Sequence, residues 1–429
     1  MMCCSEIRIC LRYGLQALKK LKLLMTFLLL VITPLSCWAG VSDDILKGIQ
    51  KIIDEDRIAY QMPGVQVSVI FPGEMVPHDF VSGMTTLEGS NLVNPKNLFQ
   101  IGSQTKSFTA ATLLLLEAKG LLSIEDPIDK WLPNLPTSWK PITIRQLLNH
   151  TSGIFNFTES EKWVATTIQD YFQKQWMPEE LVSYVKEEPT YFAPGKGYHY
   201  SNTNFVLASM IVQAVTRVSM EDMLGELILK PLHLEDTHYI PTFYSEAILQ
   251  RMAHGYSFQT LFPGEVKDVT YFNNSWGHGA GGVISTTHDT AIWLKKLLNG
   301  SLLPAKQMNE MLALVDNEEG KPLAHDDPKS GDGLGIGRDY VFGEEVWGHS
   351  GGTLGYNSIM GWMKCRDIVI AVAINDAKNI SDEGSDSVRL VVDLISYLRK
   401  VDPSQQCSVS SNKNTMLKTH VFKGLSSNK

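Results

Sequence analysis

The chain has 429 residues, of which 44% are apolar and 20% are charged, and its formal net charge at pH 7 is −8. This composition supplies a sizeable hydrophobic core and excludes a chain that is mainly disordered. The excess of acidic residues argues against nucleic-acid binding, because an acidic surface repels the phosphate backbone.

The first 39 residues have the pattern of an export signal. Three lysines within residues 19–22 precede an apolar run at 23–33, which is too short to cross a bilayer as a helix, since that takes about 20 residues. Residues 37–39 offer a cleavage site after the alanine. We therefore expect a signal peptide at 1–39 and an exported protein, periplasmic or secreted, without a stable membrane span. An uncleaved N-terminal membrane anchor and a lipid anchor on Cys37 are the alternatives.

The cysteines agree with export. Four of the six lie in the first 37 residues, so signal cleavage would leave Cys365 and Cys407. In an oxidising compartment these two can form one disulfide, and two unrelated thiols are an equal alternative. No group of cysteines and histidines has the spacing of a zinc site. We therefore expect no metal and no cofactor.

The first part of the chain predicts a helix followed by a hairpin. Apolar residues recur at helical spacing over 41–60, and a strand pattern follows at 65–71, with a second strand near 76–81. A long apolar helix is predicted from Ser103 to Gly120, where the glycine would end it. Residues 121–280 then consist mostly of helical segments separated by Pro, Gly and Asn.

The last part of the chain returns to strands. Strand-like runs occur at 345–347, 356–362 and 368–374, and an amphipathic helix is predicted over 387–400. Residues 401–429 are polar and are predicted to be a disordered tail.

Strands near both ends and helices between them predict an α/β (α+β) fold. We expect one antiparallel sheet, flanked by the terminal helices, with an inserted mostly helical lobe. The domain would cover 40–400, with its sheet lobe from about 40–100 and 281–400 and its helical lobe at about 103–280. A cleft between two such lobes is a natural place for a substrate.

An S-x-x-K motif at Ser103 is the first candidate for chemistry. The pattern occurs at four places, but only this serine opens a long apolar helix, directly after the apolar and aromatic residues 98–102. Residues three apart on a helix face the same way, so Lys106 can reach the Ser103 hydroxyl. A serine hydroxyl needs a neighbouring base, and a desolvated lysine can lose its proton near neutral pH. A helix-capping serine beside a solvated lysine is the alternative.

A Y-x-N motif at Tyr200 and Asn202 follows a Pro-Gly turn. Tyr200 could relay a proton to a leaving group, and Asn202 could hold a substrate amide. A second Y-x-N begins at Tyr271 but lacks the Pro-Gly turn, so we rank it lower. Taken alone, a core tyrosine and a turn asparagine would be the simpler interpretation.

A third motif, rich in small residues, follows a strand-like run at residues 349–352. Small residues let a substrate backbone approach a strand closely. The amide of Gly352, together with that of Ser103, could form an oxyanion hole. His349 could supply positive charge or a hydrogen-bond donor, although a lone histidine here is more often structural.

With these three motifs in this order, residues 43–400 resemble the serine β-lactamase-related family, which includes class C β-lactamases, DD-carboxypeptidases and esterases. The segments that carry the resemblance beyond the motifs themselves are 101–109, 120–127, 147–154 and 231–237.

The resemblance implies a role for each motif residue. Ser103 would be the nucleophile, Lys106 its base partner and Tyr200 the proton shuttle. Substrate would be bound by Asn202, His349, Ser350 and Gly351. The oxyanion hole would be formed by Ser103 and Gly352. Which of Lys106 and Tyr200 takes the first proton stays open.

One departure from the family pattern bears on the substrate. Typical β-lactamases carry lysine, in K-T-G, where this chain has His349. Histidine is a weaker and pH-dependent partner for a substrate carboxylate. We therefore favour a D-alanyl-D-alanine carboxypeptidase-like peptidase or a β-lactamase-related acyl hydrolase over an efficient antibiotic-destroying enzyme. The substrate would be a D-amino-acid peptide, a β-lactam or an ester. A small-ester esterase and a non-catalytic β-lactam-binding sensor or scaffold are the alternatives.

Overall fold

A computed structural model describes residues 41–258, 265–324, 326–378, 385–401 and 407. Residues 1–46 and 47–429 make up two units of the chain. Of the first unit only residues 41–46 are described, and they include the first turn of helix α2 (Asp43–Ala59). The signal peptide expected at 1–39 lies outside the described residues. So does nearly all of the tail expected at 401–429, apart from the end of a helix at Val401 and from Cys407.

Within the described residues, the largest sheet of the second unit has eight strands, drawn from both ends of the chain. Their order is β2 (His78–Gly83), β1 (Gly64–Ile70), β13 (Ile368–Ile374), β12 (Asn357–Met363), β11 (Glu344–Gly352), β10 (Gly337–Val341), β9 (Gly331–Asp332) and β8 (Val315–Asp316). All neighbouring strands in it are antiparallel. The pairing of β1 with β13 joins the two ends of the chain, which confirms the predicted mixed α/β fold built on an antiparallel sheet.

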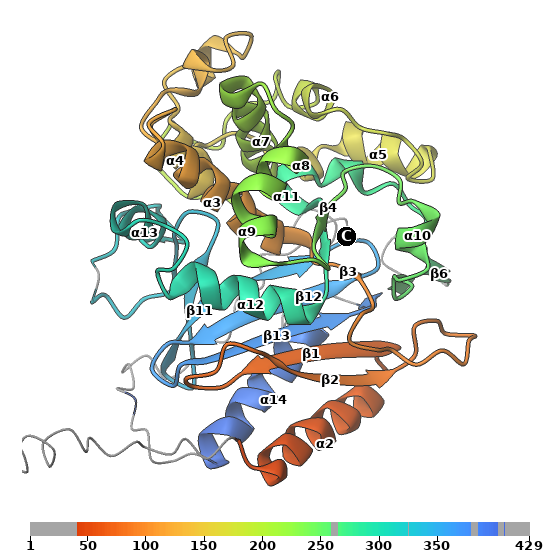
Figure 1. Cartoon of the computed structure of the whole chain (residues 1–429). Helices are drawn as coiled ribbons and strands as arrows, with labels where there is room; N and C mark the ends of the chain where they lie inside the picture. Colours follow the sequence, from red (N-terminus) through yellow and green to blue (C-terminus); the bar gives the residue numbers. More distant parts are fainter. Residues whose placement is uncertain (1–40, 259–264, 325, 379–384, 402–406, 408–429) are drawn as a thin grey trace, which may run out of the picture. The chain divides into compact units, whose positions relative to one another are not determined.

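Helices cover both faces of this sheet (Figure 1). Helix α12 (Thr287–Leu298) packs on one face, against β1, β12 and β13, and helix α14 (Asp386–Val401) packs on the other, against β12 and β13. Every residue of β1 and of β13 is buried as a result. Strands covered on both faces have continuous apolar runs rather than an alternating pattern, as in the run 368–374.

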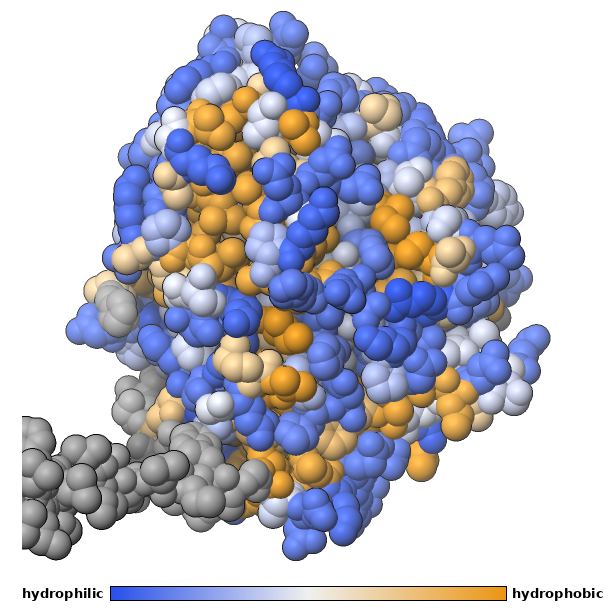
Figure 2. Space-filling model, viewed as in Figure 1, coloured by the Kyte–Doolittle hydropathy of each residue, from blue (hydrophilic) through white to orange (hydrophobic). Residues whose placement is uncertain are grey.

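The middle of the chain forms a mostly helical part. Its helices are α3 (Thr105–Ala118), α4 (Ile144–Leu148), α5 (Glu161–Gln169), α6 (Pro178–Ser183), α7 (Asn202–Thr216), α8 (Met220–Leu224), α9 (Lys230–Leu232), α10 (Glu246–Leu249) and α11 (His278–Gly281), and α13 (Ala305–Met311) follows α12. Helix α3 lies at their centre, where Phe108 stacks on Trp293 of α12 with ring centroids 4.0 Å apart. Hydrophilic residues dominate the face shown in Figure 2, with an apolar area over the region of α3, α4 and α7.

Two small sheets connect the helical part to the large sheet. In one, β7 (Val283–Ser285) pairs with β3 (Phe99–Gln100) and with β4 (His238–Tyr239). In the other, β5 (Tyr256–Phe258) pairs with β6 (Val266–Asp268) and with β14 (Asp376–Ala377). The first of these small sheets fixes the residues directly before Ser103.

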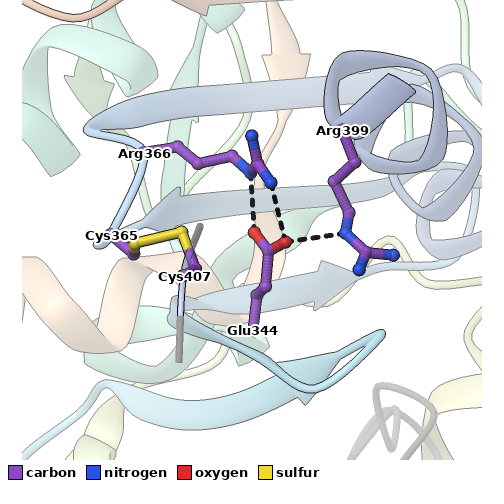
Figure 3. Close-up of a disulfide and its surroundings, with 5 residues drawn as sticks. All are labelled: Glu344, Cys365, Arg366, Arg399 and Cys407. Atoms are coloured by element: carbon purple, nitrogen blue, oxygen red, sulfur yellow. Dashed lines mark hydrogen bonds and ion pairs between the residues drawn. A yellow bond between two sulfur atoms is a disulfide. The ribbon is translucent and has the colours of Figure 1, made fainter. Parts of the chain in front are cut away.

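A disulfide and a buried ion network lie together at the far end of the large sheet (Figure 3). Cys365, in the turn between β12 and β13, is bonded to Cys407, so the pairing that the sequence left open is present. The neighbouring Arg366 makes two hydrogen bonds, of 2.7 and 2.9 Å, to the carboxylate of Glu344, and Arg399 of α14 adds a third of 2.7 Å. The first residue of β11 is thereby held to the turn and to α14.

Within the described residues, no helix has the length and apolar character needed to cross a membrane. In the same residues, no group of three or more His, Cys, Asp or Glu side chains is placed to hold a metal ion.

Candidate active site

Ser103 lies in a tight 3₁₀ turn, Gly102–Gln104, that leads directly into α3. Gly102 adopts a φ of +51°, a conformation that L-residues with side chains rarely accept. From residue 101 to residue 114, Ser103 is the only residue that is not buried. The predicted long helix therefore has one point of access to solvent at its start, and that point is the serine.

Lys106 lies three residues further on and is fully buried. Its Nζ donates hydrogen bonds to Ser103 Oγ at 2.9 Å, to Asn202 Oδ1 at 2.8 Å and to the carbonyl oxygen of Ala280 at 2.9 Å. The structure thus brings the serine and lysine of the S-x-x-K motif together, as the helical spacing predicted. The third partner comes from α11 and belongs to no predicted motif.

Burial determines the charge of Lys106. In the part of the chain that the structure describes, all three hydrogen-bond acceptors are neutral oxygens and no carboxylate pairs with the amine. Desolvation therefore holds the pKa of Lys106 well below its ordinary value of 10.5. A neutral amine keeps two protons, which the oxygens of Asn202 and Ala280 can accept, so its lone pair is left for the Ser103 hydroxyl at 2.9 Å. In that state the amine is a proton acceptor, which is what a serine needs to become a nucleophile.

Tyr200 lies beside the same pair. Lys106 Nζ is 4.7 Å from the centroid of its ring. Burial raises the pKa of Tyr200 above its ordinary value, and a hydrogen bond with Ser103 opposes this effect only in part. Tyr200 is therefore a neutral phenol at physiological pH and can donate a proton.

Asn202 is the first residue of α7 and is held from three sides. Its Oδ1 accepts the hydrogen bond from Lys106, its Nδ2 donates to Thr158 Oγ1 at 3.2 Å, and its backbone N–H donates to Asn156 Oδ1 at 3.0 Å. Asn156 and Thr158 belong to none of the three sequence motifs. The side-chain amide of Asn202 thus joins Lys106 to Thr158.

The end of strand β11 packs directly on the Ser103 turn. A Cβ atom at Gly351 would lie 1.9 Å from the carbonyl oxygen of Ile101, and one at Gly102 would lie 2.6 Å from the backbone nitrogen of Gly352. Only glycines permit this contact of backbone with backbone. It places the amide of Gly352 next to the turn that carries Ser103, as an oxyanion hole would require.

His349 and Ser350 continue the same strand and are both half-buried. The His349 ring centroid is 6.4 Å from that of Tyr200. Strand β10 pairs with β11 only as far as Gly348, whereas β12 pairs with β11 through to Gly352. Within the described residues, the segment 349–352 therefore has one edge that no strand occupies, and an extended substrate could hydrogen-bond there.

The three predicted motifs thus meet at one place, although they come from α3, from the start of α7 and from β11. The lower-ranked Tyr271 is different: its side chain is 54% exposed and its ring packs against His254. The described residues bring it into no contact with Ser103 or Lys106.

Comparison with known proteins agrees with this geometry. The chain matches the Beta-lactamase family over residues 49–392 and belongs to that family. Penicillin-binding protein 4* of Bacillus subtilis is 28% identical over 331 residues, which cover 73% of this chain and 68% of the relative.

Two solved structures share the fold at comparable identity. The D-amino acid amidase of Ochrobactrum anthropi, in complex with L-phenylalanine, is 28% identical with a TM-score of 0.72, covering 83% of this chain and 99% of that protein. A D-stereospecific amidohydrolase of a Streptomyces species is 31% identical with a TM-score of 0.66, covering 77% of this chain and 94% of that protein. The fold and family are those of serine hydrolases related to β-lactamases and penicillin-binding proteins, as the sequence motifs predicted.

Proposed function

We propose that the protein hydrolyses amide bonds of D-configured amino acids through an acyl-enzyme on Ser103. The observation that carries this proposal is the 2.9 Å hydrogen bond between Ser103 Oγ and a buried lysine amine whose partners are all neutral. The preference for D-configured substrates is supported by the two solved relatives, one named a D-amino acid amidase and the other a D-stereospecific amidohydrolase.

In this mechanism Ser103 Oγ attacks the substrate carbonyl while Lys106 accepts the hydroxyl proton. Between the two candidate bases, the pKa directions favour Lys106, because burial lowers the pKa of its amine, which favours the neutral form, and raises that of the Tyr200 phenol, which keeps it protonated. The backbone amides of Ser103 and Gly352 would stabilise the oxyanion. Tyr200 would pass a proton to the leaving nitrogen, Lys106 would reprotonate Tyr200, and water would then release the acyl group.

The strand motif would receive the substrate backbone. An extended acyl chain can pair with the edge of residues 349–352 along which no described strand runs, and His349 can contact a C-terminal carboxylate when a D-alanyl-D-alanine peptide is bound.

The first test is covalent labelling by a fluorophosphonate, followed by a substrate panel. We expect labelling of the wild-type protein, none of Ser103→Ala, and faster hydrolysis of D-phenylalanine amide than of L-phenylalanine amide. A D-alanyl-D-alanine peptide, a chromogenic cephalosporin and p-nitrophenyl acetate complete the panel. Exclusive turnover of the acetate would replace the proposal by the esterase alternative. Labelling by a fluorescent penicillin without turnover of any substrate would replace it by the sensor alternative.

A further inference from the structure

His150 is the buried centre of a segment, 147–154, that resembles the family but has no role in the mechanism above. It follows α4 and is only 3% exposed. Its φ is +62°, a left-handed conformation that is uncommon for residues other than glycine, although asparagine, aspartate and histidine adopt it more often than the rest. A buried residue kept in such a conformation suggests a task that its surroundings enforce.

His150 binds the backbone on both sides of Tyr200. Its carbonyl oxygen accepts the N–H of His199 at 3.1 Å, and its Nδ1 accepts the N–H of Ser201 at 3.1 Å. Because Nδ1 accepts a backbone proton, the imidazole proton is assigned to Nε2. One residue thus holds the backbone N–H groups of the two residues that flank the tyrosine.

The imidazole also supports the tyrosine ring itself. The two ring centroids are 4.3 Å apart with an angle of 32° between the planes. The amine of Lys106 approaches the Tyr200 ring as well, at 4.7 Å from its centroid. The phenol is therefore fixed by contacts with its ring and with its backbone.

We propose that His150 is a positioning residue for Tyr200, which aims the phenol so that it can protonate the leaving nitrogen. This inference rests on the proposed function. A positioning role can be told apart from a role in stabilising the fold. If His150 positions Tyr200, its loss should slow a reaction more when the leaving group needs a proton more. An amide needs one to leave, whereas a p-nitrophenolate does not.

Three variants separate the contributions. His150→Ala removes the acceptor and the ring. His150→Asn removes the ring but keeps an oxygen acceptor close to the place of Nδ1, and asparagine tolerates the left-handed backbone. His233→Asn is the matched control, because His233 is another left-handed histidine, with φ +55°, but is exposed and follows α9 away from Ser103.

The experiment compares hydrolysis of D-phenylalanine amide with that of D-phenylalanine p-nitrophenyl ester on the same preparation of each variant. We expect kcat/KM of His150→Ala to fall roughly 10- to 100-fold for the amide and by less than about 3-fold for the ester. His150→Asn should lie between His150→Ala and the wild type, and His233→Asn should match the wild type on both substrates. The ester rate also reports how much of each preparation is folded.

An equal loss on both substrates would overturn the positioning role, because it would mean that His150 only supports the fold. Unchanged amide hydrolysis in His150→Ala would overturn it as well. If fluorophosphonate fails to label wild-type Ser103, the proposed function fails first and the inference falls with it. The labelling result therefore tells the two failures apart.

Discussion

Lys106 and Arg366 are both buried basic side chains, and their surroundings give them opposite chemistry. Lys106 donates only to neutral oxygens, so burial lowers its pKa and favours a neutral amine. Arg366 is 5% exposed and faces the carboxylate of Glu344 through two hydrogen bonds (Figure 3). Burial by itself would raise the pKa of Glu344, but hydrogen bonds from Arg366 and Arg399 outweigh it and lower that pKa. The partner of a buried basic side chain, rather than burial alone, decides whether that side chain becomes a neutral base or stays a structural cation.

The largest effect is expected from removing the reactive amine. In Lys106→Met the serine loses its base, and kcat/KM on the amide substrate should fall roughly 10³- to 10⁴-fold. Lys295→Met is the control, since Lys295 is also buried but is paired with Asp367 outside the site. The measurement is kcat/KM of the two variants on the amide substrate, and we expect Lys295→Met to keep most of the wild-type value. Equal losses in both would mean that any buried lysine is needed for folding and none for chemistry.

For Arg366, the effect should appear in the free energy of unfolding rather than in the rate of hydrolysis. Glu344→Gln leaves Arg366 buried without a counter-charge and should lower the free energy of unfolding by about 3–5 kcal/mol. The lowered pKa of Glu344 means that the wild type gains this stability above the ordinary pKa of a glutamate and loses it as the pH falls through the folded pKa.

Urea unfolding at neutral and at acidic pH measures both effects of Glu344→Gln. Glu345→Gln is the control, because Glu345 is half-buried and its ion pair with Lys364 is partly exposed. Losing this ion pair should lower the free energy of unfolding by less than about 1 kcal/mol. A cost in Glu344→Gln no larger than in this control would contradict the comparison.

The disulfide beside Arg366 should contribute a somewhat smaller amount. Cys365 and Cys407 are 42 residues apart, and replacing both by serine should cost about 2–4 kcal/mol. A reductant should lower the Tm of the wild type to that of the double variant, and it should leave the Tm of the double variant unchanged. If the reductant breaks the bond, as thiol titration would show, without moving the Tm, the bridge does not secure this part of the ion network.

The smallest effect is expected from a substitution that would make Lys106 resemble the charged, structural Arg366. Asn202→Asp places a carboxylate of nearly the same shape where the amide oxygen lies 2.8 Å from Lys106 Nζ. A charged partner raises the pKa of the lysine, so the rate at pH 7 should fall about 10- to 100-fold and recover as the pH is raised. The pH dependence of kcat/KM tests this expectation. A loss of the same size at every pH would show that Asn202 acts on the substrate rather than on the charge of Lys106.

Much of this architecture could be predicted from local sequence patterns. The helix expected from Ser103 to Gly120 is present as α3, which ends at Ala118 with Gly120 in a left-handed conformation. The strand expected at 65–71 is β1, one residue earlier, and that at 368–374 is β13. Each of these elements has a strong local signal, which is a long apolar helix, an alternating strand and a continuous apolar run, and the apolar residues of all three are mostly buried.

The parts that could not be predicted depend on tertiary contacts without a local signal. The carbonyl of Ala280 carries no side-chain signature, yet it is a partner of Lys106 from 174 residues away. Strands β8 and β9 have two residues each, too few to show a period. The pairing of Cys365 with Cys407 could not be decided from two isolated cysteines, because the geometry that joins them arises only when α14 packs on the sheet.

The backbone contact between Gly351 and Ile101 has a consequence for how this protein can change. In an ordinary core, substitutions adjust the fit by one methyl or methylene group at a time. At Gly351 the smallest side chain would already collide with main-chain oxygen at 1.9 Å, so no gradual series of replacements exists there. New substrate preferences should therefore arise in the half-buried side chains around this contact, such as His349, while the contact itself admits no variation.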